Sequence, residues 1–357
     1  MRIDRITYIG DAGDPALNLF AGAREPQLRH WFEPHGGLFI AESPMIVSRA
    51  LDAGCRPYSV LIEDRCIERE EYSALLHRLR EAAPALPIHA APHALLTRIT
   101  GYELTRGLLC AMHRPEERSA ADICQSARRS TVSEGEERSA AGICRSARRI
   151  AVLEDVENPT NVGAIFRSAA ALGLDAVLLA GGTADPLQRR ALRTGMGAPL
   201  LLPWAYLRPG QKIKAGIDTN RSDVSVNNTV PADETPMASL PATLRSMGYV
   251  TASMALREDS LPLQQIRRIT DAGANNDTNN DIKKERGDRL AILLGNEGHG
   301  LTDLTIRESD YVFRIPMYHG VDSLNVAAAA AVVFYELARP SAPHSTFTAS
   351  DTPRAHP

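Results

Sequence analysis

The stretch that decides the fold joins the end of a strand to a long helix at residues 315–337, IPMYHGVDSLNVAAAAAVVFYEL. A strand at 311–315 breaks at Pro316, and the chain turns at Gly320. The alanine-rich segment that follows predicts a helix with Ser323 as its N-cap. Its apolar residues recur at helical spacing, which predicts one buried face: Val326, Ala329, Ala330, Val333 and Leu337.

The sequence Ser323-Leu324-Asn325 stands where this loop meets the helix. A helix entrance offers unpaired backbone N–H groups and short polar side chains to a ligand. An ordinary strand–loop–helix unit of an α/β domain explains the same pattern. Two further stretches, at 158–169 and 293–301, are needed to choose between these interpretations.

Composition limits the possible functions of the chain. Its 357 residues suggest about two domains, and 44% hydrophobic residues suffice for a sizeable core. The formal net charge of −3 does not favour nucleic acid by bulk charge, so any such binding must use a local patch.

Cysteine usage and the N-terminus predict a cytoplasmic protein with no metal and no membrane segment. None of the five cysteines forms a CxxC pair or a zinc-like cluster with histidine, and reduced thiols are the simplest interpretation: Cys55, Cys66, Cys110, Cys124 and Cys144. The N-terminus lacks the apolar core of a signal peptide, and no run of about 18 apolar residues exists.

Residues 1–114 predict a small α/β domain, because strands and helices alternate there. The expected elements are a strand at 38–41, a helix at 44–53 capped by Ser43 and closed by Gly54, a strand at 59–62 and a helix at 69–82. Residues 115–149 then form a linker. In it, EERSAADICQSARRS at 116–130 is repeated as EERSAAGICRSARRI at 136–150, which is a tandem duplication.

Residues 150–338 predict a second α/β domain. A buried strand opens it, and the next helix has an apolar stripe of Val162, Ile165, Phe166, Ala169 and Leu172. Further expected elements are a strand at 174–179, a helix at 185–199 that ends in glycines, a strand at 200–203, a helix and strand within 243–256, and a strand at 290–294.

Three segments differ in composition from these domains. Residues 209–236 and 271–288 are rich in Asn, Asp and Thr and contain all the lysines, so we expect surface insertions there. The Pro/Ser/Thr-rich tail at 339–357 is predicted to be disordered.

Taken in order, three stretches resemble the three motifs of the SpoU (TrmH-type) RNA ribose 2′-O-methyltransferases of the SPOUT superfamily. They are NPTNVGAIFRSA at 158–169, LLGNEGHGL at 293–301, and IPM with SLNVAAA within 315–329. The N-terminal segments GGLFIAES, VSRAL and SVLI resemble, more loosely, the substrate-binding domain that often precedes this catalytic domain.

The resemblance implies a parallel α/β domain whose C-terminal segment forms a deep trefoil knot, preceded by a smaller α/β RNA-binding domain related to a ribosomal-protein fold. It implies S-adenosylmethionine as the methyl donor. It also implies a homodimer in which the motif that carries Arg167 lies by the cofactor site of the other subunit.

The resemblance also assigns residues. Arg167 would bind the phosphate beside the target ribose or act as a base, and positioning is favoured because arginine keeps its proton in nearly all proteins. Asn161 would orient Arg167 or the ribose, and Glu297 would hold Arg167 or Asn161. Ser323 and Asn325 would lie near the cofactor and the target hydroxyl. The candidate cofactor residues are Leu294, Gly295, Ile315 and Leu324.

The sequence favours an RNA 2′-O-methyltransferase that acts on ribosomal RNA, with transfer RNA as the second choice. A non-catalytic RNA-binding protein of ribosome assembly is the alternative, suggested by the weak basic charge and the large insertions. A nicotinamide-dependent enzyme is disfavoured, because GNEGHG has GxxGxG order and lies late in the chain.

Overall fold

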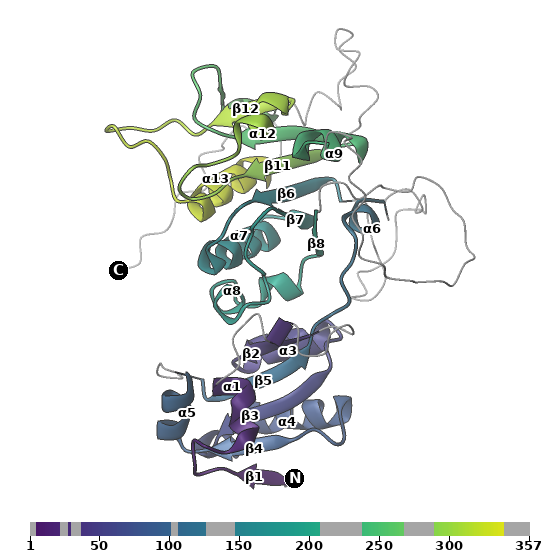
Figure 1. Cartoon of the computed structure of the whole chain (residues 1–357), viewed down its shortest axis with the longest axis vertical. Coiled ribbons are helices and arrows are strands. Elements are labelled where there is room, and N and C mark those ends of the chain that lie inside the picture. The colour runs from purple at the N-terminus through teal and green to yellow at the C-terminus, as the bar shows by residue number, and fades with distance from the viewer. Residues whose placement is uncertain are drawn as a thin grey trace, which may run out of the picture.

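The computed structural model describes residues 5–21, 28–29, 37–100, 106–125, 147–207, 238–267 and 289–338. The predicted insertions at 209–236 and 271–288, the tail at 339–357 and linker residues 126–146 lie outside this range. Two sheets organise the described chain, and Figure 1 shows them as separate layers along the long axis of the molecule.

The N-terminal sheet is mixed, with strand order β1-β4-β3-β5-β2. β1, β4 and β3 are parallel, and β5 runs antiparallel to both β3 and β2. The strands are β1 (Ile6–Tyr8), β2 (Leu38–Glu42), β3 (Pro57–Glu63), β4 (Ile88–Ala91) and β5 (Leu108–His113). The helices are η1 (Pro15–Leu17), α1 (Asn18–Ala21), α3 (Pro44–Asp52), η2 (Asp64–Cys66), α4 (Glu70–Ala82) and α5 (His93–Thr100).

Alternate residues of each strand point to opposite faces, so both faces of this sheet are buried. One core joins the sheet to α3 and α4, and a second joins it to α1 and α5. Gly54 ends α3 with a φ of +79°, as the sequence predicts. Ser43 occupies the N-cap position of α3, as predicted, but it has a φ of +89° and its side chain makes no capping hydrogen bond.

The C-terminal sheet is wholly parallel, with strand order β10-β12-β9-β11-β6-β7-β8. The strands are β6 (Arg149–Glu154), β7 (Ala176–Ala180), β8 (Trp204–Tyr206), β9 (Val250–Met254), β10 (Leu261–Pro262), β11 (Leu290–Leu294) and β12 (Tyr311–Arg314). The helices are α6 (Ala120–Gln125), α7 (Pro159–Ala171), α8 (Arg189–Thr194), η4 (Ala198–Leu200), α9 (Leu240–Ser246), η5 (Leu263–Gln265), α12 (Asp303–Glu308) and α13 (Val326–Ala338).

Helices cover both faces of this sheet, as a parallel sheet requires. α7 and α13 pack on one face, with the predicted α7 residues Val162, Ile165, Phe166 and Ala169 fully buried. α6, α9 and α12 cover the other face. The sequence therefore identifies the two longest helices of this domain from their apolar stripes.

Three local predictions in this domain are wrong. The strand expected at 200–203 is a 3₁₀ turn that ends at Leu200, and the edge strand begins at Trp204, after Pro203. The helix expected across 185–199 is confined to α8. The N-cap of α13 is Asn325, two residues beyond the predicted Ser323, because its Oδ1 accepts the Ala327 N–H at 3.0 Å.

Side chains of α8 and the loop before it connect the two sheets. Leu187 and Leu192 belong to the same core as α3 and α4. Arg114, which follows β5, donates to Asp185 at 2.7 Å, and both side chains are buried. The two sheets therefore meet through a buried apolar contact and a buried ion pair.

The linker helix α6 is anchored to the second domain by Arg289. The guanidinium donates to the carbonyl oxygen of Cys124 at 2.6 Å and to that of Ala147 at 3.4 Å, and it lies 4.3 Å from the ring centroid of Tyr249. Tyr249 in turn donates its hydroxyl to the Ala147 carbonyl at 2.8 Å. The residues on either side of 126–146 are thus both bonded to the guanidinium of Arg289.

Deleting residues 126–145 should leave a folded protein whose melting temperature is within about 2 °C of wild type. The deletion removes one 20-residue repeat and joins Gln125 to Ser146. Residues 124 and 147 would then be three peptide units apart, which span up to about 10 Å. Thermal unfolding measures the effect. An Arg289→Ala variant is the destabilised reference, and a similar loss of stability on deletion would contradict this account of the linker.

Candidate active site

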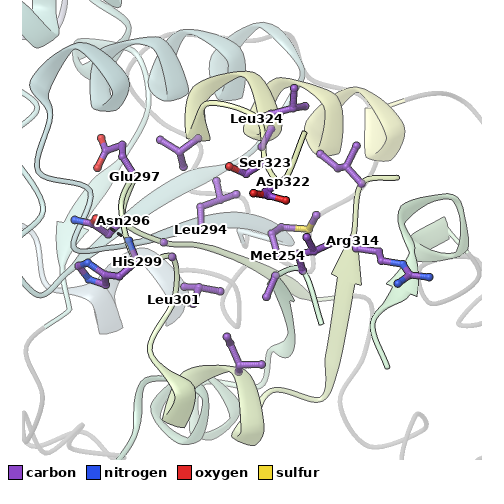
Figure 2. A pocket seen from close by; sticks show the side chains of 18 of the residues that line it. Met254, Leu294, Asn296, Glu297, His299, Leu301, Arg314, Asp322, Ser323 and Leu324 are labelled. Carbon is purple, nitrogen blue, oxygen red and sulfur yellow. Dashed lines mark hydrogen bonds between the residues drawn. The ribbon is translucent and has the colours of Figure 1, made fainter. Parts of the chain in front are cut away.

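A pocket of about 580 Å³ opens at the carboxyl ends of β9, β11 and β12 (Figure 2). Its walls are residues 254–257 after β9, 294–301 after β11, 313–317 around the end of β12, and 322–326 at the start of α13. Carboxyl ends of neighbouring parallel strands meet at one edge of a sheet, where α/β proteins bind ligands. The volume lies within the usual range for cofactor pockets.

The glycine-rich loop after β11 forms a tight turn on one side of this pocket. The backbone groups of Asn296 and Gly300 bond to each other twice, at 3.0 Å each. A Cβ on Gly295 would lie 2.3 Å from the Gly300 carbonyl carbon and from the Leu301 nitrogen. Only glycine therefore fits at 295, and the loop presents backbone groups to the pocket.

Asn296 holds this loop and is a residue that the sequence analysis missed. Its Nδ2 donates to the Asp155 carbonyl at 2.8 Å, and its Oδ1 accepts the Gly298 N–H at 2.7 Å. Asparagine bonding to a backbone N–H two residues later is a known turn signal. The Gly-Asn-Glu-Gly sequence therefore carried the information, but the bond to Asp155 depends on tertiary structure.

A chain of side-chain hydrogen bonds connects the three sequence motifs. Asn325 caps α13 through Oδ1, which leaves its Nδ2 to donate to Asn161 Oδ1 at 3.1 Å. Asn161 then donates its own Nδ2 to Glu297 Oε1 at 2.7 Å. The N-cap bond fixes which side-chain atom of Asn325 is the donor, and the bond from Asn325 in turn fixes the orientation of the Asn161 amide. Asn161, the middle member, is 7% exposed, whereas Glu297 and Asn325 are exposed, so only the centre of this chain is shielded from water.

The predicted cofactor residues Leu294, Gly295, Ile315 and Leu324 all line the pocket. Ser323 lines it as well, beside Asp322. In Figure 2, Leu294 lies between the loop that carries Glu297 and the loop that carries Ser323. Met254, at the end of β9, and His299, on the same loop as Glu297, also line the pocket, and neither was singled out from the sequence.

Arg167 is not part of the pocket of its own chain. It is exposed on α7, and within the described residues it has no hydrogen-bond or ion-pair partner. Of the two contacts that the sequence offered for Glu297, the structure contains the one to Asn161 and not the one to Arg167.

Other catalytic chemistries find little support in the described ranges. Cys55, Cys66, Cys110 and Cys124 are free and buried, and burial raises the pKa of each thiol, that of Cys55 to about 11. A thiolate nucleophile is therefore disfavoured among them. No group of three His, Cys, Asp or Glu side chains gathers there as a metal site. None of the described helices has the length and apolarity to cross a membrane.

Comparison with known proteins assigns the family. The sequence pattern of the SpoU rRNA Methylase family matches residues 148–335. An uncharacterized tRNA/rRNA methyltransferase of Mycobacterium bovis is 32% identical over 331 residues, which cover 92% of this chain and 90% of that protein. The 23S rRNA (guanosine(2553)-2′-O)-methyltransferase RlmP of Bacillus subtilis is 27% identical, over 52% of this chain and 56% of its own.

Solved structures share the fold at lower identity. An rRNA methyltransferase from Sinorhizobium meliloti superposes with a TM-score of 0.61 at 18% identity, covering 93% of this chain and 96% of the other. A second crystal structure from that organism, with AdoMet bound, gives a TM-score of 0.60 at 19% identity, covering 93% and 97%. From the family match and the near full-length relative, this chain belongs to the SpoU rRNA methylase family and is a methyltransferase.

Proposed function

We propose that this protein transfers a methyl group from S-adenosylmethionine to a ribose 2′-hydroxyl, in ribosomal RNA. The observation that carries the proposal is the hydrogen-bond chain from Asn325 through Asn161 to Glu297, at the edge of a pocket of cofactor size. It brings together side chains that lie up to 164 positions apart in the sequence.

The pocket suits S-adenosylmethionine, which supplies an electrophilic methyl group on a sulfonium. Leu294, Ile315 and Leu324 provide apolar surface for a flat adenine. The turn that requires glycine at 295 brings backbone N–H and carbonyl groups to the pocket surface. Such groups can bind the donor without a charged side chain.

The target hydroxyl is a poor nucleophile and must be held in line with the methyl group. Ser323 is exposed at the pocket and can accept a hydrogen bond from the hydroxyl. Arg167 binds the phosphate beside the target ribose as a planar bidentate donor. The Asn325–Asn161–Glu297 chain holds the loops in the arrangement that this alignment requires.

A homodimer explains why Arg167 is remote from the pocket of its own chain. α7 packs against α13, whose outer face exposes Val332 (41%) and Tyr335 (57%). A second copy that covers this apolar face would place the Arg167 of one subunit by the pocket of the other. Active sites would then be shared between the two subunits.

The proposal includes a trefoil knot and an RNA-binding N-terminal domain. The chain visits the edge strand β10, returns to β11 beside β6, leaves again to β12, and comes back in α13. The Leu337 carbonyl of α13 accepts from Arg149 of β6 at 2.6 Å. This return past earlier strands is the path that a C-terminal knot needs. The N-terminal domain, with its separate sheet, would select the RNA.

The test is transfer of radiolabelled methyl from S-adenosylmethionine by the full-length protein to ribosomal RNA, to transfer RNA and to an unstructured RNA of equal length. We expect 2′-O-methylated nucleosides, identified by mass spectrometry, from ribosomal RNA. Mapping of total RNA from cells without the gene should show loss of the same mark. Methylation of transfer RNA alone would replace ribosomal RNA by transfer RNA as the proposed substrate. Binding of RNA without any methyl transfer would support the ribosome-assembly alternative.

A further inference from the structure

Glu154 is a buried carboxylate that the proposed mechanism does not use. It is the last residue of β6, an interior strand of the sheet, and is 9% exposed. It does not line the pocket. Within the described ranges it pairs with no basic side chain, so neutral donors must stabilise its charge.

Those donors all come from the first turn of α12. Glu154 Oε2 accepts the Thr302 backbone N–H at 3.2 Å. Glu154 Oε1 accepts the hydroxyls of Thr302 at 3.2 Å and Thr305 at 2.8 Å. Thr305 is 3% exposed, so its bond to Glu154 is shielded from water and correspondingly strong, whereas Thr302 is exposed at the edge of the cluster.

The cluster fastens the far end of the glycine-rich loop. That loop leaves β11 at Gly295 and enters α12 after Leu301, and it contains three glycines, so few of its own side chains can stiffen it. Asn296 ties its near end to the Asp155 carbonyl. The consecutive residues 154 and 155 therefore hold both ends of the loop that carries Glu297.

We propose that Glu154 is a positioning residue for binding of the methyl donor, which it affects through Thr302 and Thr305. This inference rests on the proposed use of S-adenosylmethionine. A loop held at one end only would sample arrangements in which its backbone groups miss the donor, so donor affinity should fall. RNA binding and the chemical step should change much less.

The test compares matched pairs of variants in the full chain. Thr305→Val keeps the shape and removes the hydroxyl, whereas Thr305→Ser keeps the hydroxyl; Glu154→Gln removes the charge. The control is Thr251→Val in β9, because the Thr251 hydroxyl also donates to a carboxylate, Asp310, at 2.7 Å and is fully buried. Titration calorimetry with S-adenosylmethionine measures the Kd, and thermal unfolding measures stability.

We expect Thr305→Val and Glu154→Gln to raise the Kd for S-adenosylmethionine by roughly tenfold and its KM in parallel, with kcat within about threefold. Thr305→Ser should match wild type. Thr251→Val should lower stability without changing the Kd. An unchanged Kd in both loop variants, well below their melting temperatures, would overturn the inference. Failure of the wild-type protein to bind S-adenosylmethionine would instead overturn the proposed function.

Discussion

Replacing Arg167 with alanine should lower kcat for RNA methylation by about 10²–10³-fold, the usual loss when one preorganised charged or polar group is removed from an active site. Affinity for S-adenosylmethionine should stay unchanged, because Arg167 is assigned to the RNA phosphate and does not line the pocket of its own chain. Stability should stay within about 0.5 kcal/mol of wild type, because the side chain is exposed and unpaired among the described residues. Single-turnover methylation measures the rate, and titration calorimetry measures the affinity for S-adenosylmethionine.

Two further variants sharpen this prediction. Arg190→Ala removes another exposed arginine from the neighbouring helix α8 and should leave kcat near that of wild type. Arg167→Lys keeps the charge without the planar fork and should recover only part of the activity. Equal losses in the Arg167 and Arg190 alanine variants would mean that general positive charge is sufficient, and would remove Arg167 from its assigned role.

A mixed dimer shows in which subunit Arg167 acts. Ala329 lines the pocket, so Ala329→Trp should block donor binding. Homodimers of the Arg167→Ala variant and of the Ala329→Trp variant should each be inactive. If Arg167 acts across the interface, a heterodimer of the two variants contains one site with an intact pocket and an intact arginine. Random mixing should then restore about one quarter of wild-type activity if Arg167 acts across the interface. No recovery would mean that Arg167 serves its own chain.

Periodicity predicted the long elements of the fold and failed for the short ones. The stripes in α7 and α13 are long enough to be distinctive, and both helices cover the core as expected. β10 has only two residues, and one of them is Pro262, so no pattern could identify it. α12 is short and was also missed. The edge strand β8 was placed at 200–203 because leucines occupy the first positions of that stretch, although pairing begins at Trp204.

The candidate site was predicted as separate motifs. The contact of Glu297 with Asn161 was one of two predicted alternatives, and the other connections were not predicted. Ser323 and Asn325 are both good helix caps, and only the structure shows that Asn325 occupies the N-cap while it also binds Asn161. The bond from Asn296 to Asp155 and the cluster around Glu154 link residues more than 140 positions apart. Such contacts depend on strand order, which hydrophobic patterns do not encode.

Replacing Asn161 with aspartate should impair the protein strongly and in a pH-dependent way. A carboxylate oxygen would replace Nδ2 at 2.7 Å from Glu297 Oε1. Two carboxylates at that distance cannot both ionise without a large cost, so the pair should retain a proton and one pKa of the pair should rise well above its usual range. Each unit of pKa change corresponds to about 1.4 kcal/mol of stability.

The expected loss of stability has a defined direction with pH. Because folding raises a carboxyl pKa in this variant, the penalty is absent below the unfolded value of about 4 and grows as the pH rises toward the folded value. A rise of two units would cost about 3 kcal/mol at neutral pH, or roughly 6–12 °C in melting temperature for a domain of this size. Relative to wild type, methylation activity should fall by about 10²-fold at pH 8 and recover partly toward pH 6.

The matched control is Asn158→Asp, at the N-cap of the same helix. Asn158 Oδ1 accepts the Thr160 N–H at 2.9 Å, and an aspartate accepts the same bond equally well. This variant should show neither the loss of stability nor the pH dependence. Melting curves of both variants between pH 5 and 8 decide the matter. A flat profile for Asn161→Asp would mean that the side chain leaves Glu297 instead of sharing a proton with it, and that the chain from Asn325 to Glu297 is not needed to hold the three loops together.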